Sequence, residues 1–345
     1  MAEDPKSRGP GDQAATPERT ESSGLPALFP QFGIAVCFFA AVLGGMATFD
    51  RAVALGLGFD DPHQVGNVGV FAAVVLGATV VMVATFRYDR GMEFIRLLMV
   101  AVFGWLVALA VVLATDVGTV VTDNPVLEGF PASPFPAVVM VLTAALLWLY
   151  PEWYVLNVVG IVSGAAGIAI LGISFGPFPI VVLLVAWAAY DAYAVYWSGH
   201  MKELAGGATS LKVPVVFVFP EDPGFSIRED GLTVVEGGTD GEENADSSPF
   251  QGAILGLGDA LIPGMLAVSA AEFLDAPVLV SALNANAPAL GTVGGAVVGI
   301  LVLNYIVHHY EGVHAGLPPL VTCVLAGYLL GAVAGGVPVQ VALGL

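Results

Sequence analysis

The stretch Phe250–Leu274, FQGAILGLGDALIPGMLAVSAAEFL, is long enough to cross a bilayer and is almost entirely apolar. Its charged residues are Asp259, which ends the sequence Gly256-Leu257-Gly258-Asp259, and Glu272, near the end of the run. A carboxylate within a membrane span is costly, so it usually faces the protein interior or water and marks a functional site. Asp191 lies in the preceding apolar run in the same way. We therefore predict that Asp191 and Asp259 act as a pair.

The composition predicts the class of protein. Of the 345 residues, 57% are hydrophobic and only 11% are charged, whereas about a quarter of the residues in a soluble domain are charged. The apolar runs lack the alternating pattern of β-barrel strands. We predict an all-α, polytopic membrane protein with nine transmembrane helices. The absence of a basic patch argues against a nucleic-acid partner and leaves the lipid bilayer as the surroundings of the chain.

Nine apolar runs approach the length that a bilayer requires, roughly 17–25 residues. They lie near Gln31–Phe49, Gly66–Phe86, Phe94–Thr115, Pro136–Leu149, Tyr154–Ser174, Phe178–Trp197, Phe250–Leu274, Thr292–Ile306 and Leu317–Gly336. We predict a disordered cytoplasmic tail at 1–27, helices one to six at 28–197, an acidic cytoplasmic loop at 198–249 and helices seven to nine at 250–345. Within the loop, the composition predicts an extended segment at Leu211–Pro220 and a hairpin at Phe225–Val235.

The charged residues predict the orientation. With the N-terminus in the cytoplasm, nine of the 10 lysine and arginine residues fall on the cytoplasmic side and only Arg51 falls outside. We therefore expect a multi-pass protein of the cell membrane with an extracellular C-terminus. The net charge is −19, and Lys6, Lys202 and Lys212 are the only lysines. Acidic, lysine-poor loops are typical of proteins exposed to very high salt, so we expect a halophilic source.

The two aspartates are predicted to lie at matched depth. Asp191 lies near the cytoplasmic end of span six and Asp259 follows the start of span seven, which places both roughly 9–14 Å deep at 1.5 Å per residue. Gly256, three residues before Asp259, would share its helix face and let span six approach. Tyr190 offers a hydroxyl beside Asp191 but points to a different face. Gly258 neighbours Asp259 without sharing its face.

Two carboxyl groups this close do not both ionise at low cost, so they share a proton and titrate as a unit. Such a pair suits hydrolysis of an amide. The ionised partner takes a proton from water, and the protonated partner polarises the scissile carbonyl. This chemistry needs no metal and no cofactor.

The segment Tyr190-Asp191 in YDAYAV and the segment Gly256-Leu257-Gly258-Asp259 resemble the YD and GxGD motifs of the presenilin and signal peptide peptidase superfamily, the GxGD intramembrane aspartyl proteases. The order of the motifs on spans six and seven is more specific than GxGD alone. The resemblance covers roughly Gln31 to the C-terminus and is nearest to the archaeal presenilin-like proteins, which together with the acidic loops suggests a haloarchaeon. It implies a presenilin-like fold with catalytic Asp191 and Asp259, supported by Tyr190, Gly256 and Gly258.

The family has a third motif, Pro-Ala-Leu, at the start of span nine. Leu317-Pro318-Pro319-Leu320 opens span nine here, whereas Pro288-Ala289-Leu290 has the letters but precedes span eight. We assign the motif to Pro318, Pro319 and Leu320 by their place in the topology, and the resemblance implies that they position the substrate.

By the same resemblance, the partners are single-span transmembrane substrates with an external N-terminus, and the sequence indicates no accessory subunits. A helix must unwind before its peptide bonds can be cut, and its freed backbone groups then need partners within the membrane. Strand addition to Leu211–Pro220, or to the segment before Gly252, is our hypothesis for those partners.

Three alternatives were weighed against this interpretation. Gly172-Ile173-Ser174-Phe175-Gly176 matches the GxSxG pattern of a serine nucleophile, but it ends a span, with no histidine evident at that depth. A histidine-rich turn resembles a zinc site but lacks H-E-x-x-H, and it comprises His308, His309, Glu311 and His314. A proton- or ion-coupled transporter or channel would also use intramembrane carboxylates, but it would often show paired repeats, and none is visible.

Overall fold

The computed structural model describes residues 25–85, 91–115, 134–198, 215–229, 250, 252–309 and 315–344. Its α-helices are α1 (Leu25–Ala54), α2 (Gly66–Thr85), α3 (Gly91–Ala114), α4 (Phe135–Leu149), α5 (Trp153–Ser174), α6 (Pro177–Tyr193), α8 (Leu257–Phe273), α9 (Ala287–His309), α10 (Leu317–Ala334) and α11 (Val339–Ala342). A π-helical segment, η1 (Ala194–Ser198), continues α6, and η2 (Ser281–Leu283) is a 3₁₀ turn. The strands are β1 (Val216–Pro220), β2 (Gly252–Gly256), β3 (Val278–Val280) and β4 (Ala285–Asn286).

The helices agree with the predicted class of protein. Among the described residues, six helices are long and apolar enough to cross a membrane, and two shorter apolar helices accompany them. These helices support a multi-pass membrane protein. The predicted tail at 1–27 lies almost wholly outside the described residues, and the first helix begins at Leu25. The fold is mainly helical rather than strictly all-α, because it includes two short two-stranded sheets.

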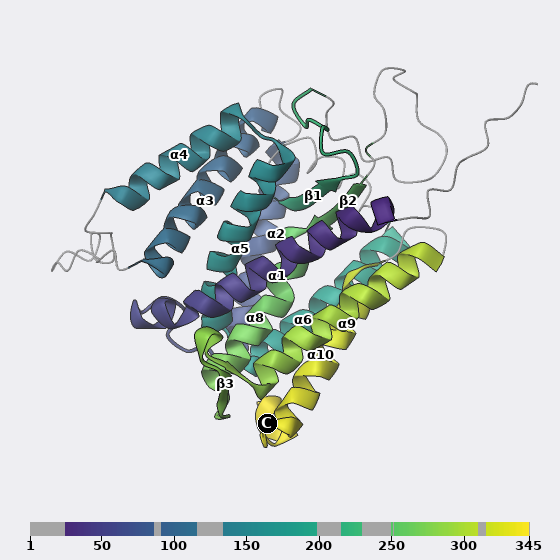
Figure 1. The fold of residues 1–345 in the computed structure, drawn as a ribbon. Helices are drawn as coiled ribbons and strands as arrows, with labels where there is room; N and C mark the ends of the chain where they lie inside the picture. Colours follow the sequence, from purple (N-terminus) through teal and green to yellow (C-terminus); the bar gives the residue numbers. More distant parts are fainter. Residues whose placement is uncertain are drawn as a thin grey trace, which may run out of the picture.

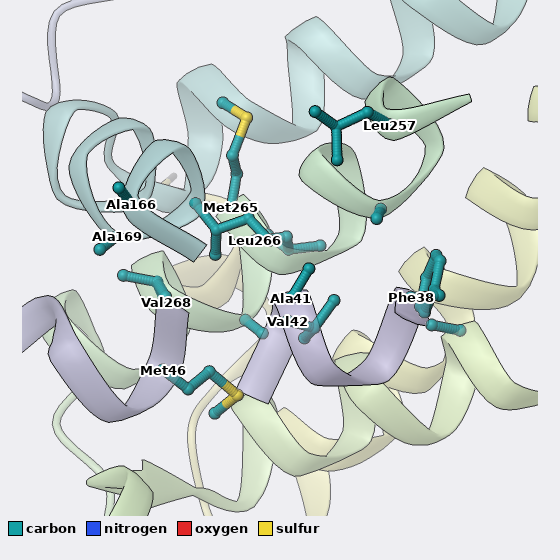
Figure 2. Packing of buried hydrophobic residues seen from close by; sticks show 14 of the residues in the cluster. Phe38, Ala41, Val42, Met46, Ala166, Ala169, Leu257, Met265, Leu266 and Val268 are labelled. Carbon is teal, nitrogen blue, oxygen red and sulfur yellow. The ribbon is translucent and has the colours of Figure 1, made fainter. Parts of the chain in front are cut away.

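The helices form a bundle with the β1–β2 sheet at one end and β3 and the C-terminus at the other (Figure 1). Buried residues of α1, α5 and α8 form a large part of the core, among them Ala41, Ala166 and Leu266 (Figure 2). Small residues let α5 approach both neighbours closely: a Cβ at Gly164 would lie 3.1 Å from Leu257 of α8 and 3.4 Å from Ala41 of α1.

The pair of helices α9 and α10 packs backbone against backbone. A Cβ added at Gly291 would overlap the carbonyl oxygen of Gly327, and one at Gly331 would overlap that of Ala287. Glycines at these crossing points allow a contact that no larger residue permits. Asn286 begins α9, because its side-chain Oδ1 accepts a hydrogen bond of 3.0 Å from the N–H of Ala289.

The predicted helix Phe250–Leu274 is wrong in its first part. Residues Gly252–Gly256 form β2, which pairs antiparallel with β1, and α8 begins only at Leu257. Pairing with β1 satisfies backbone groups of β2 that a helix would have bonded internally, and two glycines weaken the competing helix. The predicted extended segment Leu211–Pro220 is confirmed for Val216–Pro220.

Two further boundaries differ from prediction. Phe225–Glu229, the described part of the predicted hairpin Phe225–Val235, contains no strand, and β1 pairs with β2 instead. The rest of that hairpin lies outside the described residues. Helix α9 begins at Ala287 rather than at Thr292, because Asn286 caps it, so Pro288-Ala289-Leu290 lies in its first turn.

Candidate active site

Asp191 lies near the end of α6 and is held by a helix distant in sequence. Its side chain is only 6% exposed. The carboxylate Oδ2 accepts a hydrogen bond of 3.0 Å from the backbone N–H of Leu317, the first residue of α10. The first N–H groups of a helix have no partner within it, so they are available to an anionic group. Pro318 and Pro319 have no N–H, which leaves Leu317 as the donor at this point.

The helix changes its geometry directly after Asp191. The N–H of Ala194 bonds to the carbonyl oxygens of both Asp191 and Tyr190, and η1 follows. Such π-helical turns occur frequently at functional sites. Tyr190 is 57% exposed, so it faces away from the buried Asp191, as its place next to Asp191 in a helix predicted.

Asp259 is held by the residues that precede it. It is the third residue of α8, and Gly256 is the N-cap. Its carboxylate lies beside Gly256. A Cβ at Gly256 would lie 3.3 Å from Asp259 Oδ2. The prediction that Gly256 admits span six is therefore wrong, because the helix begins one residue later and Gly256 adjoins Asp259 itself.

The two aspartates come together at one end of the bundle. Helices α6 and α8 are in contact, Asp191 lies near the last turn of the former, and Asp259 lies in the first turn of the latter. Both aspartates lie where regular α-helix gives way to other backbone.

The two candidates for the third motif lie at opposite ends of α10. Pro318, Pro319 and Leu320 directly follow the Leu317 N–H that binds Asp191. Pro288-Ala289-Leu290 lies beside the far end of α10, where Cβ atoms added at Gly331 and Gly335 would meet Ala287 and Pro288. The geometry therefore places the first candidate, and not the second, beside the aspartates.

A family model described as signal-peptide peptidase, presenilin aspartyl protease matches residues 34–337. The chain belongs to this family. It is therefore an intramembrane aspartic endopeptidase, a hydrolase.

Two solved structures support the assignment. One, a presenilin family intramembrane aspartate protease in space group C222, is 26% identical, with a TM-score of 0.59 over 88% of this chain and 99% of that one. The other, such a protease in space group P2, is 25% identical, with a TM-score of 0.55 over 90% of this chain and 99% of that one. No curated protein sequence matches this chain significantly.

Beside Asp259, the protease has an apolar cavity of about 150 Å³ that the sequence did not indicate. Gly258 lines it, together with side chains from four helices: Phe71, Leu171, Leu183, Trp187 and Met265 among them. A Cβ added at Gly258 would meet no atom within 4 Å. Gly258 therefore leaves space next to a catalytic candidate, and it does not serve a close contact between helices.

The serine and histidine alternatives gain no support from the described residues. The hydroxyl of Ser174 is buried and donates a 2.6 Å hydrogen bond to the carbonyl of Ile170 in its own helix. His63 does lie against Gly176, so the expectation of no histidine at that depth is wrong, but its ring contacts Phe273. The ring of His309 stacks on Tyr305, and Glu311 and His314 lie outside the described residues.

Proposed function

We propose that this protease hydrolyses peptide bonds within the transmembrane helices of single-span membrane proteins, with Asp191 and Asp259 as the catalytic dyad. One observation carries the proposal. Two carboxylates lie at the same end of two membrane helices that are in contact, and a helix N-terminus binds one of them. One carboxylate takes a proton from the attacking water while the other, protonated, polarises the scissile carbonyl. Leu317 keeps Asp191 in place for this exchange.

The β1–β2 sheet supports the hypothesis that an unwound substrate adds a strand to the enzyme. Backbone groups alternate between the two edges of an antiparallel strand. The N–H of Leu257 bonds to the carbonyl of Val215 at 2.9 Å, so Val218, paired with Ile254, directs its N–H and C=O away from β2. Asn157 binds both groups of Val218. The outer edge of β1 is therefore occupied.

The outer edge of β2 is then the place for a substrate strand. Ile254 directs its N–H and C=O away from β1 by the same alternation, and none of the described residues bonds to them. The edge leads directly to Asp259, five residues further on. Ile254→Pro would remove one outward N–H and spare the β1–β2 bonds. We expect a raised KM with an unchanged melting temperature; an unchanged KM would contradict strand addition at this edge.

We further propose nine transmembrane spans with a cytoplasmic N-terminus and an extracellular C-terminus, and substrates whose N-terminus is external. The distribution of basic residues supports this orientation. Six long apolar helices, together with the shorter apolar helices α2 and α4 and with α8, make up the nine. We expect the chain to act without accessory subunits. The transporter interpretation is not favoured by a family of aspartyl proteases.

The test uses the purified full chain in liposomes with a labelled single-span substrate. Asp191→Asn and Asp259→Asn should each abolish cleavage. Glu272→Gln is the matched control, because Glu272 is a carboxylate on α8 at the end away from Asp259, and it should retain cleavage. Cleavage that survives either aspartate change would exclude the dyad. A proton or ion flux that depends on the same two residues, without cleavage, would favour transport.

A further inference from the structure

Helix α5 holds β1 through hydrogen bonds between Asn157 and Val218, which we call the clamp. Such a contact is unusual for a membrane helix. Asn157 is only 4% exposed, and its amide uses both of its functions on one residue of the strand. Its Nδ2 donates to the carbonyl of Val218 at 2.7 Å, and its Oδ1 accepts from the N–H of Val218 at 2.9 Å. A buried polar side chain within a membrane span is costly unless it is fully paired, so this one holds β1 at a defined height on α5.

Glycines of α5 and α1 leave room for the aromatic side chains of β1 beside this clamp. A Cβ at Gly160 of α5, one turn from Asn157, would lie 3.0 Å from the ring of Phe217. A Cβ at Gly33 of α1 would overlap the ring of Phe219, which also packs against Trp153 at 5.2 Å between ring centroids. The position of β1 is therefore determined by α5 and α1.

The position of β1 is transmitted to Asp259 over a short path. All five residues of β1 pair with β2, from Val216 with Gly256 to Pro220 with Gly252. The N–H of Leu257, the first residue of α8, then bonds to Val215 just before β1. No loop separates β2 from α8, and Gly256, the last residue of β2, lies beside the Asp259 carboxylate. A displaced β1 therefore displaces the first turn of α8.

The face of α5 that contacts β1 also packs against α8. A Cβ at Gly164 would lie 3.1 Å from the side chain of Leu257, and one at Gly167 would lie 3.0 Å from that of Leu261. Asn157, Gly160, Gly164 and Gly167 follow one another at helical spacing. One face of α5 thus contacts both β1 and the helix that bears Asp259.

We propose that Asn157 is a positioning residue for the protease, which sets where Asp259 and the edge of β2 stand relative to Asp191. This inference rests on the proposed role of Asp259 and goes beyond it. If the substrate backbone pairs with the edge of β2, the hydrogen bonds between Asn157 and Val218 also determine which peptide bond reaches the aspartates. Loss of the clamp should then broaden the choice of scissile bond and not merely slow the reaction.

The test compares Asn157→Leu with the wild type in liposomes, and mass spectrometry of the products gives the cleavage positions. We expect kcat to fall about tenfold or more, the loss that weakened positioning of a catalytic group can cause, with additional cuts at neighbouring peptide bonds. Ser163→Ala is the matched control. Ser163 is buried on α5, but its hydroxyl donates to Val159 of its own helix at 2.6 Å. It should retain the wild-type rate and cut.

If Asn157→Leu does not fold, a second variant, Asn157→Asp, tests the proposal. A carboxylic acid offers the donor and acceptor of an amide, whereas a carboxylate offers acceptors only. Asn157→Asp should therefore approach the cleavage pattern of the wild type, measured at the same pH, as the pH is lowered. An unchanged cleavage pattern in Asn157→Leu, or a pattern of Asn157→Asp that is indifferent to pH, would overturn the proposal. Cleavage by Asp259→Asn in the same assay would instead overturn the dyad.

Discussion

The two aspartates of this protease are held in different ways. Asp191 depends on a residue 126 positions away, because its carboxylate is bound by the first N–H of α10. Asp259 depends on its own neighbours, because its carboxylate lies beside Gly256, three residues earlier. One half of the candidate dyad is therefore placed by the packing of α6, α9 and α10. The other is placed by a strand that leads directly into a helix. Damage to each support should have different consequences.

The largest effect on stability and cleavage is expected at the backbone contact between α9 and α10, because this contact positions the residue that binds Asp191. In Gly327→Leu, the new side chain would overlap the carbonyl of Gly291 and force α9 and α10 apart. Overpacking of this kind costs about 1–3 kcal/mol or more, and it would also move Leu317 away from Asp191. We expect a strongly lowered melting temperature and loss of cleavage.

The control for this change lies on the same pair of helices. Gly294 is exposed, and a Cβ there would meet no atom within 4 Å. Gly294→Leu should leave the melting temperature and the rate of cleavage close to those of the wild type. A protein that folds and cleaves normally with Gly327→Leu would show that Asp191 does not need the close pair.

A more selective change removes only the donor to Asp191. Leu317 is the first residue of α10, where proline is well tolerated, and Leu317→Pro would delete the N–H that binds the carboxylate. A hydrogen bond to a charged group is worth about 1.5–3 kcal/mol, so kcat/KM should fall about ten- to a hundredfold. Leu317→Ala keeps the N–H and should retain most of the activity. Equal losses in the two variants would assign the effect to the leucine side chain instead.

On the Asp259 side, the corresponding change is smaller. Gly256 has φ −61° and ψ 135°, a conformation open to alanine, so Gly256→Ala should not strain the backbone. Its Cβ would lie 3.3 Å from Asp259 Oδ2, which is tight enough to shift the carboxylate. We expect kcat to fall about three- to tenfold, less than 1.4 kcal/mol in the barrier, with an unchanged melting temperature. An unaltered kcat would show that Asp259 tolerates the shift.

The helices were predictable because a bilayer imposes length and hydropathy on each span. The second and fifth spans were predicted within one residue of α2 and α5 at both ends. The strand β2 lies within the seventh apolar run, where a helix was predicted. Its sequence, GAILG, is apolar enough for either a helix or a strand. Its state is decided by β1, more than 30 residues earlier, and by the clamp from α5.

For the site, the sequence indicated the residue types but not their supports. The two carboxylates could be recognised because a charged group in an apolar run is energetically costly. The order of the spans indicated that the third motif follows Gly316. The bond from Leu317 and the cavity beside Gly258 depend on how four helices pack, which no local pattern encodes. Asn157 is a signal in the sequence for one of these supports, because a lone amide in a membrane span usually has a hydrogen-bond partner.

The smallest effect on rate, and the most informative on specificity, is expected at Gly258. Unlike Gly256, it has room for a Cβ and borders the apolar cavity of about 150 Å³. Gly258→Ala should keep kcat for a substrate with alanine near the scissile bond within about twofold, since no contact of Asp259 is lost. The narrower cavity should disfavour phenylalanine at that position. The measurement is kcat/KM for substrates with alanine, leucine or phenylalanine there. A uniform loss across the three would mean that Gly258 serves the Asp259 carboxylate, as Gly256 does; a loss that grows with side-chain size would separate the two glycines, one for the catalytic group and one for the substrate.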